Sequence, residues 1–440
     1  MRQVAGLIST YSSDEFGICS ALFELGGMVV MHDASGCNST YTTHDEPRWY
    51  EMDSMVYISA ISEAEAIMGD DDKFIRDLVE TAGELHPAFI ALLGAPIPYM
   101  IGTDLDAIAM IVEQETGIPC FGFQANGMHD YTVGVSMAMK RMVEAFAGER
   151  LAGAAGKELS AGAADGEAFA GNAEVSGGNA ADGVDLRQIG QRNQRTGQTA
   201  VNIIGATPLD FSVNGSIASI RQWITDNGMI PGVCLSMGCE IEELKKLKDA
   251  DVNLVVSGGG LAAARVLEER FGTPYVTGVP FGETFSVRLA AMLKQAAAAR
   301  VSYSDFREPL SQAAEEKDSE LQTTGNPDEI RAVIIGESVF CTSLAAAIEL
   351  DTGIPVRVLC PLEEEDCLLR PGDRKTPEED DLSREIGKAD VVIGDPLYRS
   401  LTEGQRFYDL PHEAFSGRIY DRVSPNLIAK KIEKGNRILK

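Results

Sequence analysis

The chain has 440 residues, of which 44% are hydrophobic, and its 67 acidic and 38 basic side chains give a formal net charge of −29. This length is too great for one ordinary hydrophobic core and predicts two or three domains. The negative charge disfavours nucleic acid and anionic membranes as partners, because both attract basic surfaces. No apolar run is long enough to span a membrane, and the acidic N-terminus does not resemble a signal peptide. We therefore expect a cytoplasmic protein.

Short β-rich apolar runs alternate with longer helical stretches in three segments, which predicts βαβ units and parallel sheets. In the first segment we expect strands at 27–32, 88–94 and 118–124, and helices at 71–85, 104–117 and 133–148. In the second segment we expect strands at 200–207, 252–260 and 274–280, and helices at 216–228, 240–249 and 284–299. In the third segment we expect strands at 331–338, 356–361 and 389–396, and a helix at 343–353.

The segments are separated by stretches of different composition. Residues 151–198 are rich in Gly, Ala and small polar residues and offer few large side chains to bury, so they are predicted to form a flexible linker or surface insertion. A second polar joint precedes the third segment. The expected domains are therefore 1–150, 199–324 and 325–440.

Several candidate binding residues follow the expected strands. Ligands of open parallel sheets bind beyond the carboxyl ends of the strands. The residues at these ends are Cys37, Ala95, Pro96, Gln124 and Asn126 in the first segment, Thr207 and Ser257 to Gly260 in the second, and Glu337, Cys341 and Asp395 in the third. So many in one chain predict a cleft between domains, a common place for a cofactor.

Well-known nucleotide-binding and hydrolase motifs are absent from the sequence. There is no GxxxxGK[ST] loop, so we do not expect the chain to hydrolyse ATP itself, and no GxGxxG follows the first strand. HExxH and GxSxG are also missing, which argues against a zinc hydrolase and a serine hydrolase.

Two of the eight cysteines lie in suggestive places. Cys37, with His32 and His44 near it, follows a strand on a Gly-bearing turn and is either a small loop residue or a metal ligand. Cys19 is expected near the first turn of a helix capped by one of residues 12–14, where the helix dipole favours a thiolate. Because no CxxC occurs, cluster ligands must come from distant positions or from more than one chain.

The stretch FGICSALFELGGMVVMHDASGCNSTYTTH resembles the opening of nitrogenase component 1 subunits and protochlorophyllide reductase-type subunits. The resemblance continues through EAEAIMGDDDKFIRDL, AFIALLGAPIPYMIGTDLDAI, VNIIGATP, CEIEELKKLKDADVNLVVSGGG and ADVVIGDP, and so covers nearly the whole chain outside 151–198. It implies three Rossmann-like α/β domains with mainly parallel sheets around a central cleft.

The resemblance also implies an iron–sulfur site. In the family, cysteines matching Cys19 and Cys37 ligate a cluster at a subunit interface. Residues 94–98 lack the family's third cluster thiol, so we expect two chains to hold one [4Fe–4S] cluster, either as a homodimer or with a sister subunit. A separate ATP-dependent iron protein would deliver the electrons.

The expected substrate site lies in the cleft. Ser257 stands where the nitrogenase catalytic subunit has a cofactor cysteine, so no iron–molybdenum cofactor is expected. We expect Gln124, Ser257, Gly258 and Gly259 to bind the substrate or cofactor, with Glu337 and, by a loose match, His412 as catalytic groups. One alternative is a non-catalytic scaffold or carrier for metal-cofactor assembly, and another is a cluster-free protein with two buried cysteines.

Overall fold

The computed structural model describes residues 12–36, 38, 41, 46–148, 197–303, 332–417, 419 and 424–432. Cys37, His44 and nearly all of the predicted linker 151–198 lie outside these residues. In the described parts of the chain, no helix is long and apolar enough to cross a membrane.

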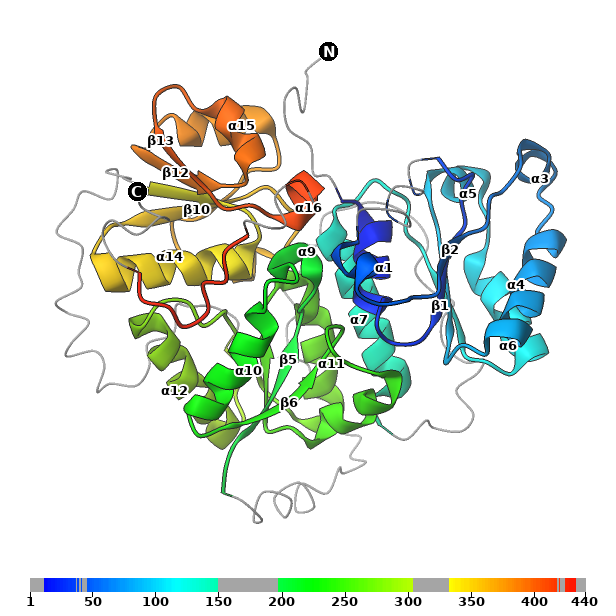
Figure 1. The fold of residues 1–440 in the computed structure, drawn as a ribbon, viewed down its shortest axis with the longest axis horizontal. Helices are drawn as coiled ribbons and strands as arrows, with labels where there is room; N and C mark the ends of the chain where they lie inside the picture. The colour runs from blue at the N-terminus through cyan, green and yellow to red at the C-terminus, as the bar shows by residue number, and fades with distance from the viewer. Residues whose placement is uncertain are drawn as a thin grey trace, which may run out of the picture. The chain divides into compact units, whose positions relative to one another are not determined.

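The first sheet has four strands in the order β2-β1-β3-β4, and all of its pairings are parallel (Figure 1). Successive side chains of a strand point to opposite faces, so the sheet separates two apolar clusters. Val29 and Met31 belong to the larger cluster, and Met28 and Val30 to the smaller one. The elements of this segment are α1 (Asp14–Leu22), β1 (Met28–Met31), η2 (Pro47–Tyr50), β2 (Val56–Ile58), α3 (Glu63–Met68), α4 (Asp72–Leu85), β3 (Ile90–Leu93), α5 (Pro96–Ile101), α6 (Leu105–Thr116), β4 (Cys120–Phe123) and α7 (Tyr131–Phe146).

The second sheet has the order β6-β5-β7-β8 and is again entirely parallel. Its expected helix at 240–249 is present as the 3-10 helix η4. The elements are β5 (Ala200–Ile204), α9 (Pro208–Phe211), α10 (Ser216–Asp226), β6 (Ile230–Cys234), η4 (Ile241–Asp249), β7 (Val252–Val255), η5 (Gly258–Gly260), α11 (Leu261–Phe271), β8 (Tyr275–Thr277) and α12 (Thr284–Ala299).

The third sheet has five parallel strands in the order β11-β10-β9-β12-β13. Its elements are β9 (Ala332–Ile335), α14 (Ser338–Thr352), β10 (Val356–Cys360), η6 (Asp366–Leu368), β11 (Arg374–Lys375), α15 (Glu379–Ile386), β12 (Val391–Gly394), η7 (Pro396–Leu401), β13 (Arg406–Asp409) and α16 (Glu413–Ser416). Three parallel sheets with flanking helices confirm the predicted α/β class.

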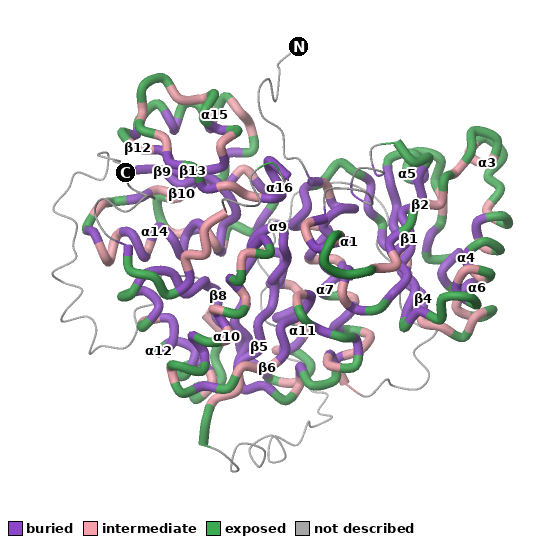
Figure 2. Tube along the Cα trace, viewed as in Figure 1, coloured by how far each residue is buried: buried purple, intermediate pink, exposed green. Residues whose placement is uncertain are grey.

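One continuous apolar core joins the three sheets, and Figure 2 shows its buried strands beneath more exposed outer helices. All nine residues of α1 are buried, and this helix packs on α7. Contact between the two helices depends on Gly17 and Gly134: a Cβ on Gly17 would lie 2.1 Å from the carbonyl oxygen of Tyr131, and a Cβ on Gly134 would lie 1.9 Å from that of Asp14. This crossing fixes the start of α7 beside the strand ends of the second sheet.

Candidate functional site

The strand orders place four of the predicted site residues at switch points, where the connections from two neighbouring strands leave in opposite directions. In the second sheet, neighbours β5 and β7 carry connections that leave in opposite directions, and β9 and β12 do the same in the third sheet. Such switch points are the usual ligand sites of open α/β sheets. Thr207 and Ser257 follow β5 and β7, and Glu337 and Asp395 follow β9 and β12.

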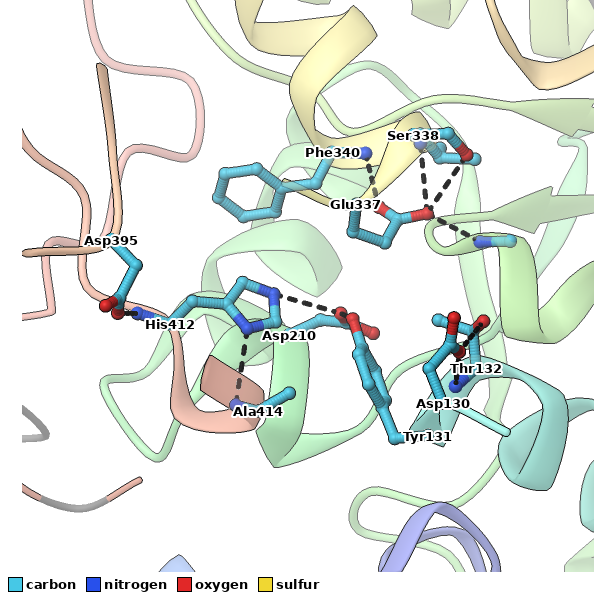
Figure 3. A network of polar contacts seen from close by, with 12 residues as sticks. Asp130, Tyr131, Thr132, Asp210, Glu337, Ser338, Phe340, Asp395, His412 and Ala414 are labelled. Carbon is cyan, nitrogen blue, oxygen red and sulfur yellow. Dashed lines mark hydrogen bonds and ion pairs between the residues drawn. The ribbon is translucent and has the colours of Figure 1, made fainter. Parts of the chain in front are cut away.

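Glu337 is completely buried and connects the second and third sheets (Figure 3). As the N-cap of α14, its carboxylate accepts hydrogen bonds from the backbone N–H groups of Val339 at 3.0 Å and Phe340 at 2.6 Å. It also accepts one from the N–H of Gly258 at 2.8 Å. The predicted residues Glu337 and Gly258 are therefore in direct contact.

A second buried carboxyl, that of Glu364, lies against the first. Glu364 accepts a hydrogen bond from the N–H of Ser338 at 2.7 Å and is within 3.5 Å of the Cys360 sulfur. Burial raises the pKa of Glu337 well above its ordinary value, and the charge of Glu364 raises it further. Burial likewise raises the pKa of Glu364. The pair therefore favours holding a proton at neutral pH.

Tyr131, Asp210 and His412 bring together loops from all three segments. The Tyr131 hydroxyl donates a 2.5 Å hydrogen bond to Oδ1 of Asp210, and Nε2 of His412 lies 3.3 Å from the same oxygen. Because Nδ1 of His412 accepts the N–H of Ala414 at 3.3 Å, a neutral imidazole carries its proton on Nε2, which faces Asp210. This arrangement, which lies near Glu337 in Figure 3, can hold or move a proton.

Two further aspartates hold these loops in place. Asp130 caps α7 through the N–H of Thr132 and accepts the N–H of Glu363 at 2.5 Å, which ties the first segment to the third. Asp395 accepts the backbone N–H of His412 at 2.9 Å and the Ser416 hydroxyl at 2.7 Å. Both contacts fix backbone next to the candidate reacting groups.

Several buried polar atoms of this network make no hydrogen bond among the described residues: Oγ1 of Thr207, Oδ2 of Asp210, Oγ of Ser257, Oε1 of Glu364 and Nε2 of His412, whose 3.3 Å contact with Asp210 lacks hydrogen-bond geometry. Each such atom costs about 1–3 kcal/mol unless a ligand or water satisfies it. Asp210 and His412 also line a small cavity of about 20 Å³, which has room for roughly one water. The concentration of unsatisfied atoms is typical of a binding site.

The glycines after Ser257 are closely packed. A Cβ on Gly258 would lie 2.2 Å from Oε1 of Glu364, and one on Gly259 would lie 2.7 Å from the Val135 side chain. Both positions require glycine, because a larger side chain would collide with Glu364 or Val135. A role of Gly258 and Gly259 in cofactor binding stays a prediction.

Gln124 lies apart from this network. It follows β4, the edge strand of the first sheet, and is exposed, and its side-chain amide donates to Asp106 at 3.4 Å. An edge strand is not a switch point, which explains its separation from Ser257 and Glu337.

Cys19 is fully buried on α1 and lies in the second turn, directly after the first turn near which it was expected. The helix begins at Asp14 after Ser13, so Cys19 is its sixth residue. Burial raises the pKa of the Cys19 thiol well above its ordinary value, and the carboxylates of Glu15 and Glu46 add to the effect. The predicted lowering of this pKa by the helix dipole is therefore outweighed.

The described residues fit only part of a cluster site. They contain no group of three or more His, Cys, Asp and Glu side chains that could hold a metal ion. Cys19 supplies one thiol, Cys37 lies outside the described residues, and Ala95, near the expected third thiol, is buried and apolar. Of the expected ligands, the described residues therefore include Cys19 alone.

His32 occupies an apolar position at the end of β1. Its ring stacks on Phe74 with centroids 4.1 Å apart, and Nδ1 is 2.9 Å from the Ser59 hydroxyl. Burial lowers the pKa of His32 from 6.5 to about 4. These contacts give it a structural role.

We expect His32→Phe to reduce the acid sensitivity of the protein. In the wild type, the unfolded state binds a proton at this site below pH 6.5 while the folded state resists protonation until about pH 4. Stability is therefore lost as pH falls through this window, by about 2 kcal/mol between pH 7.5 and 5. Urea unfolding at both pH values measures this difference, with exposed His86→Asn as the control. An unchanged pH dependence in His32→Phe would contradict the prediction.

Sequence reasoning missed Asp130, Tyr131, Asp210 and Glu364. Asp130 carries a recognisable signal, because it precedes a helix as an N-cap residue. Glu364 lies in the acidic run LEEED, which reads as solvated surface although this one carboxyl is buried. No local pattern distinguishes Tyr131 or Asp210.

Comparisons with known proteins agree with this geometry. A light-independent protochlorophyllide reductase subunit from Nostoc punctiforme is 31% identical over 172 residues, which cover 37% of this chain and 33% of that protein. The corresponding protein of Leptolyngbya boryana is 30% identical over 173 residues, with the same coverage. These alignments span only about a third of the length of the curated relatives.

Similarity to solved structures covers almost the whole fold. The structure described as "Nitrogenase Cp1 at pH 6.5" has a TM-score of 0.59 at 14% identity, covering 98% of this chain and 92% of the other. At this identity the likeness shows the fold alone. Residues 19–395 match the family described as nitrogenase component 1 type oxidoreductase. The chain therefore belongs to the nitrogenase component 1 type oxidoreductase family.

Proposed function

We propose that the chain is the substrate-binding component of a nitrogenase-like reductase. It receives electrons from a separate ATP-dependent iron protein and passes them to a substrate at the ends of β5, β7 and β9. The observation that carries this proposal is the cluster of unsatisfied polar atoms at the switch points of a family oxidoreductase. Glu337 and His412 are the proposed acid–base groups, and Ser257 and Gly258 the proposed binding residues.

Cys19 and Cys37 are the proposed ligands of a [4Fe–4S] cluster shared with a second chain, either an identical copy or a sister subunit. When bound, such a cluster relays single electrons. Because Cys19 is fully covered in the single chain, the residues over it must be displaced when the second chain binds. Gln124 is exposed, and its proposed binding role requires contact with the second chain or with the substrate.

Iron and sulfide analysis of anaerobically purified protein tests the ligand assignment. We expect Cys19→Ser and Cys37→Ser each to lose nearly all bound iron, because each removes two of four thiolates in a symmetric pair. Cys367→Ser is the control, since Cys367 is only partly buried, beside Glu365 and Arg265, and should keep full iron content. Wild-type iron content in Cys37→Ser would contradict the proposal.

A scaffold or carrier for metal-cofactor assembly is the second candidate. Its support is Ser257, which stands in place of a cofactor thiol, and the lack of a thiol at Ala95. The two functions differ in electron use. With a reduced iron protein and MgATP, a reductase consumes electrons in a substrate-dependent way, whereas a scaffold releases or accepts a metal cofactor without consuming them.

A further inference from the structure

Glu337 and Glu364 form a buried carboxyl pair, and no ion pair of either with Lys, Arg or His is found among the described residues. They are 0% and 6% exposed, and both carboxyls lie against Gly258: its N–H donates to Glu337 at 2.8 Å, and a Cβ there would lie 2.2 Å from Oε1 of Glu364. Further acidic charges raise their pKa values, that of Asp210 for Glu337 and that of Asp130 for Glu364. Two buried carboxylates in contact repel each other strongly, so one of them must be protonated.

The backbone contacts decide which carboxyl is the better proton carrier. Glu337 accepts three N–H bonds, from Gly258, Val339 and Phe340, which favour its ionised form. Glu364 accepts one N–H bond, from Ser338, and its Oε1 has no partner among the described residues. The proton is therefore better placed on Glu364, with Glu337 accepting from it.

The titratable groups packed around the pair do not readily accept its proton. Cys360 lies 3.5 Å from Glu364, Cys341 is buried on α14, and Tyr131 is buried at the start of α7. Burial raises the pKa of all three groups, so each keeps its own proton. The proton of the pair is consequently the one most available to a substrate near Ser257.

We propose that Glu337 and Glu364 share one proton and that Glu364 donates it to the substrate during reduction; the donor role rests on the reductase function proposed above. As the substrate gains an electron from the iron protein, the O–H bond of Glu364 breaks and the proton bonds to a substrate electron pair. The pair then carries two negative charges until solvent returns a proton. Glu337 acts in this step as the acid–base partner that shares the proton with Glu364, and it also fixes Gly258.

Infrared spectroscopy of the full-length protein tests the shared proton without any substrate. We expect a carboxylic acid C=O band at pH 7 that shifts in D2O and is lost in Glu364→Gln. Glu365→Gln is the matched control, because this neighbouring side chain is exposed and paired with Arg265, and it should leave the band intact. If the carboxylic acid band keeps its wild-type position and intensity in both Glu364→Gln and Glu337→Gln, the shared proton is refuted. If one variant does not fold, the other still decides; the wild-type band alone does not, because Glu15, whose pKa is raised to about 8, is also protonated at pH 7.

Turnover of the complete complex tests the donor role. We expect Glu364→Gln to lower substrate-dependent electron consumption by about a hundredfold or more, and to abolish the fall in rate that the wild type shows as pH rises. Wild-type rates in Glu364→Gln would overturn the donor role. If the wild-type complex consumes no electrons, the reductase function fails and the donor role with it, whereas the infrared band still decides the shared proton.

Discussion

Replacement of Gly17 or Gly134 by alanine is expected to destabilise the protein by about 3 kcal/mol, the upper part of the range for overpacked cores. Each added methyl group would meet a backbone carbonyl oxygen, at 2.1 Å for Gly17 and 1.9 Å for Gly134. Backbone atoms cannot turn aside as a flexible side chain can. The two helices must therefore separate, and thermal unfolding followed by circular dichroism measures the loss.

Gly83→Ala is the matched control for this prediction. Gly83 is also a helical glycine, in α4, but a Cβ there meets no atom within 4 Å. Alanine should stabilise this exposed position by about 0.5–1 kcal/mol, since glycine is the poorer helix former. Equal stabilities of Gly17→Ala and Gly83→Ala would contradict the close crossing of α1 and α7.

The same substitutions connect the core to the candidate site. α7 begins at Tyr131, directly after its cap Asp130, so movement of this helix displaces both. Tyr131 would lose its 2.5 Å bond to Asp210, and Asp130 its bond to the N–H of Glu363. The glycines at this helix crossing therefore fix the positions of Asp130 and Tyr131, whose hydrogen-bond partners lie in the third and second segments.

The strands at the centres of the sheets were predictable from sequence, and so were the edge strands β4 and β8, whereas β2, β6, β11 and β13 were not predicted. Residues 28–31 and 332–335 are continuous apolar runs, and 252–255 is interrupted only by Asn253; each forms a fully buried strand. The edge strand β6 contains Pro231 and Gly232, which disfavour a strand assignment, and β11 has only two residues. The four strands that were not predicted carry little hydrophobic pattern because they are less buried than β4 and β8.

The candidate site was predictable only in part, for a related reason. Strand-end position led to Ser257 and Glu337, since parallel sheets place functional loops at one edge. The partners of Glu337 depend on contacts far along the chain, such as Glu364, which reaches Ser338. Gln124 satisfied the same strand-end rule, yet strand order places it on an edge strand. Sequence gives the strands, but only their order in the sheet identifies the switch point.

Replacement of Arg48 by methionine is expected to destabilise the first segment by about 3–5 kcal/mol. The Arg48 guanidinium is 2% exposed and donates to Glu46 at 2.6 Å, to Glu24 at 2.9 Å and to the Ser20 carbonyl at 2.8 Å. Glu46 is itself 0% exposed. Removal of the cation leaves a buried carboxylate unpaired, and this uncompensated charge is the main cost.

A second substitution separates charge from packing in this prediction. Glu46→Gln in the Arg48→Met background removes the orphaned charge and should restore part of the lost stability, while exposed Arg76→Ala should have little effect. Urea unfolding in a Trp223→Phe background is followed through the fluorescence of Trp49. The Trp49 ring lies 6.0 Å from the Phe23 ring, and the Arg48 guanidinium stacks on Phe23 at 4.6 Å. A double variant no more stable than Arg48→Met would show that lost packing, and not the unpaired Glu46 carboxylate, causes the destabilisation.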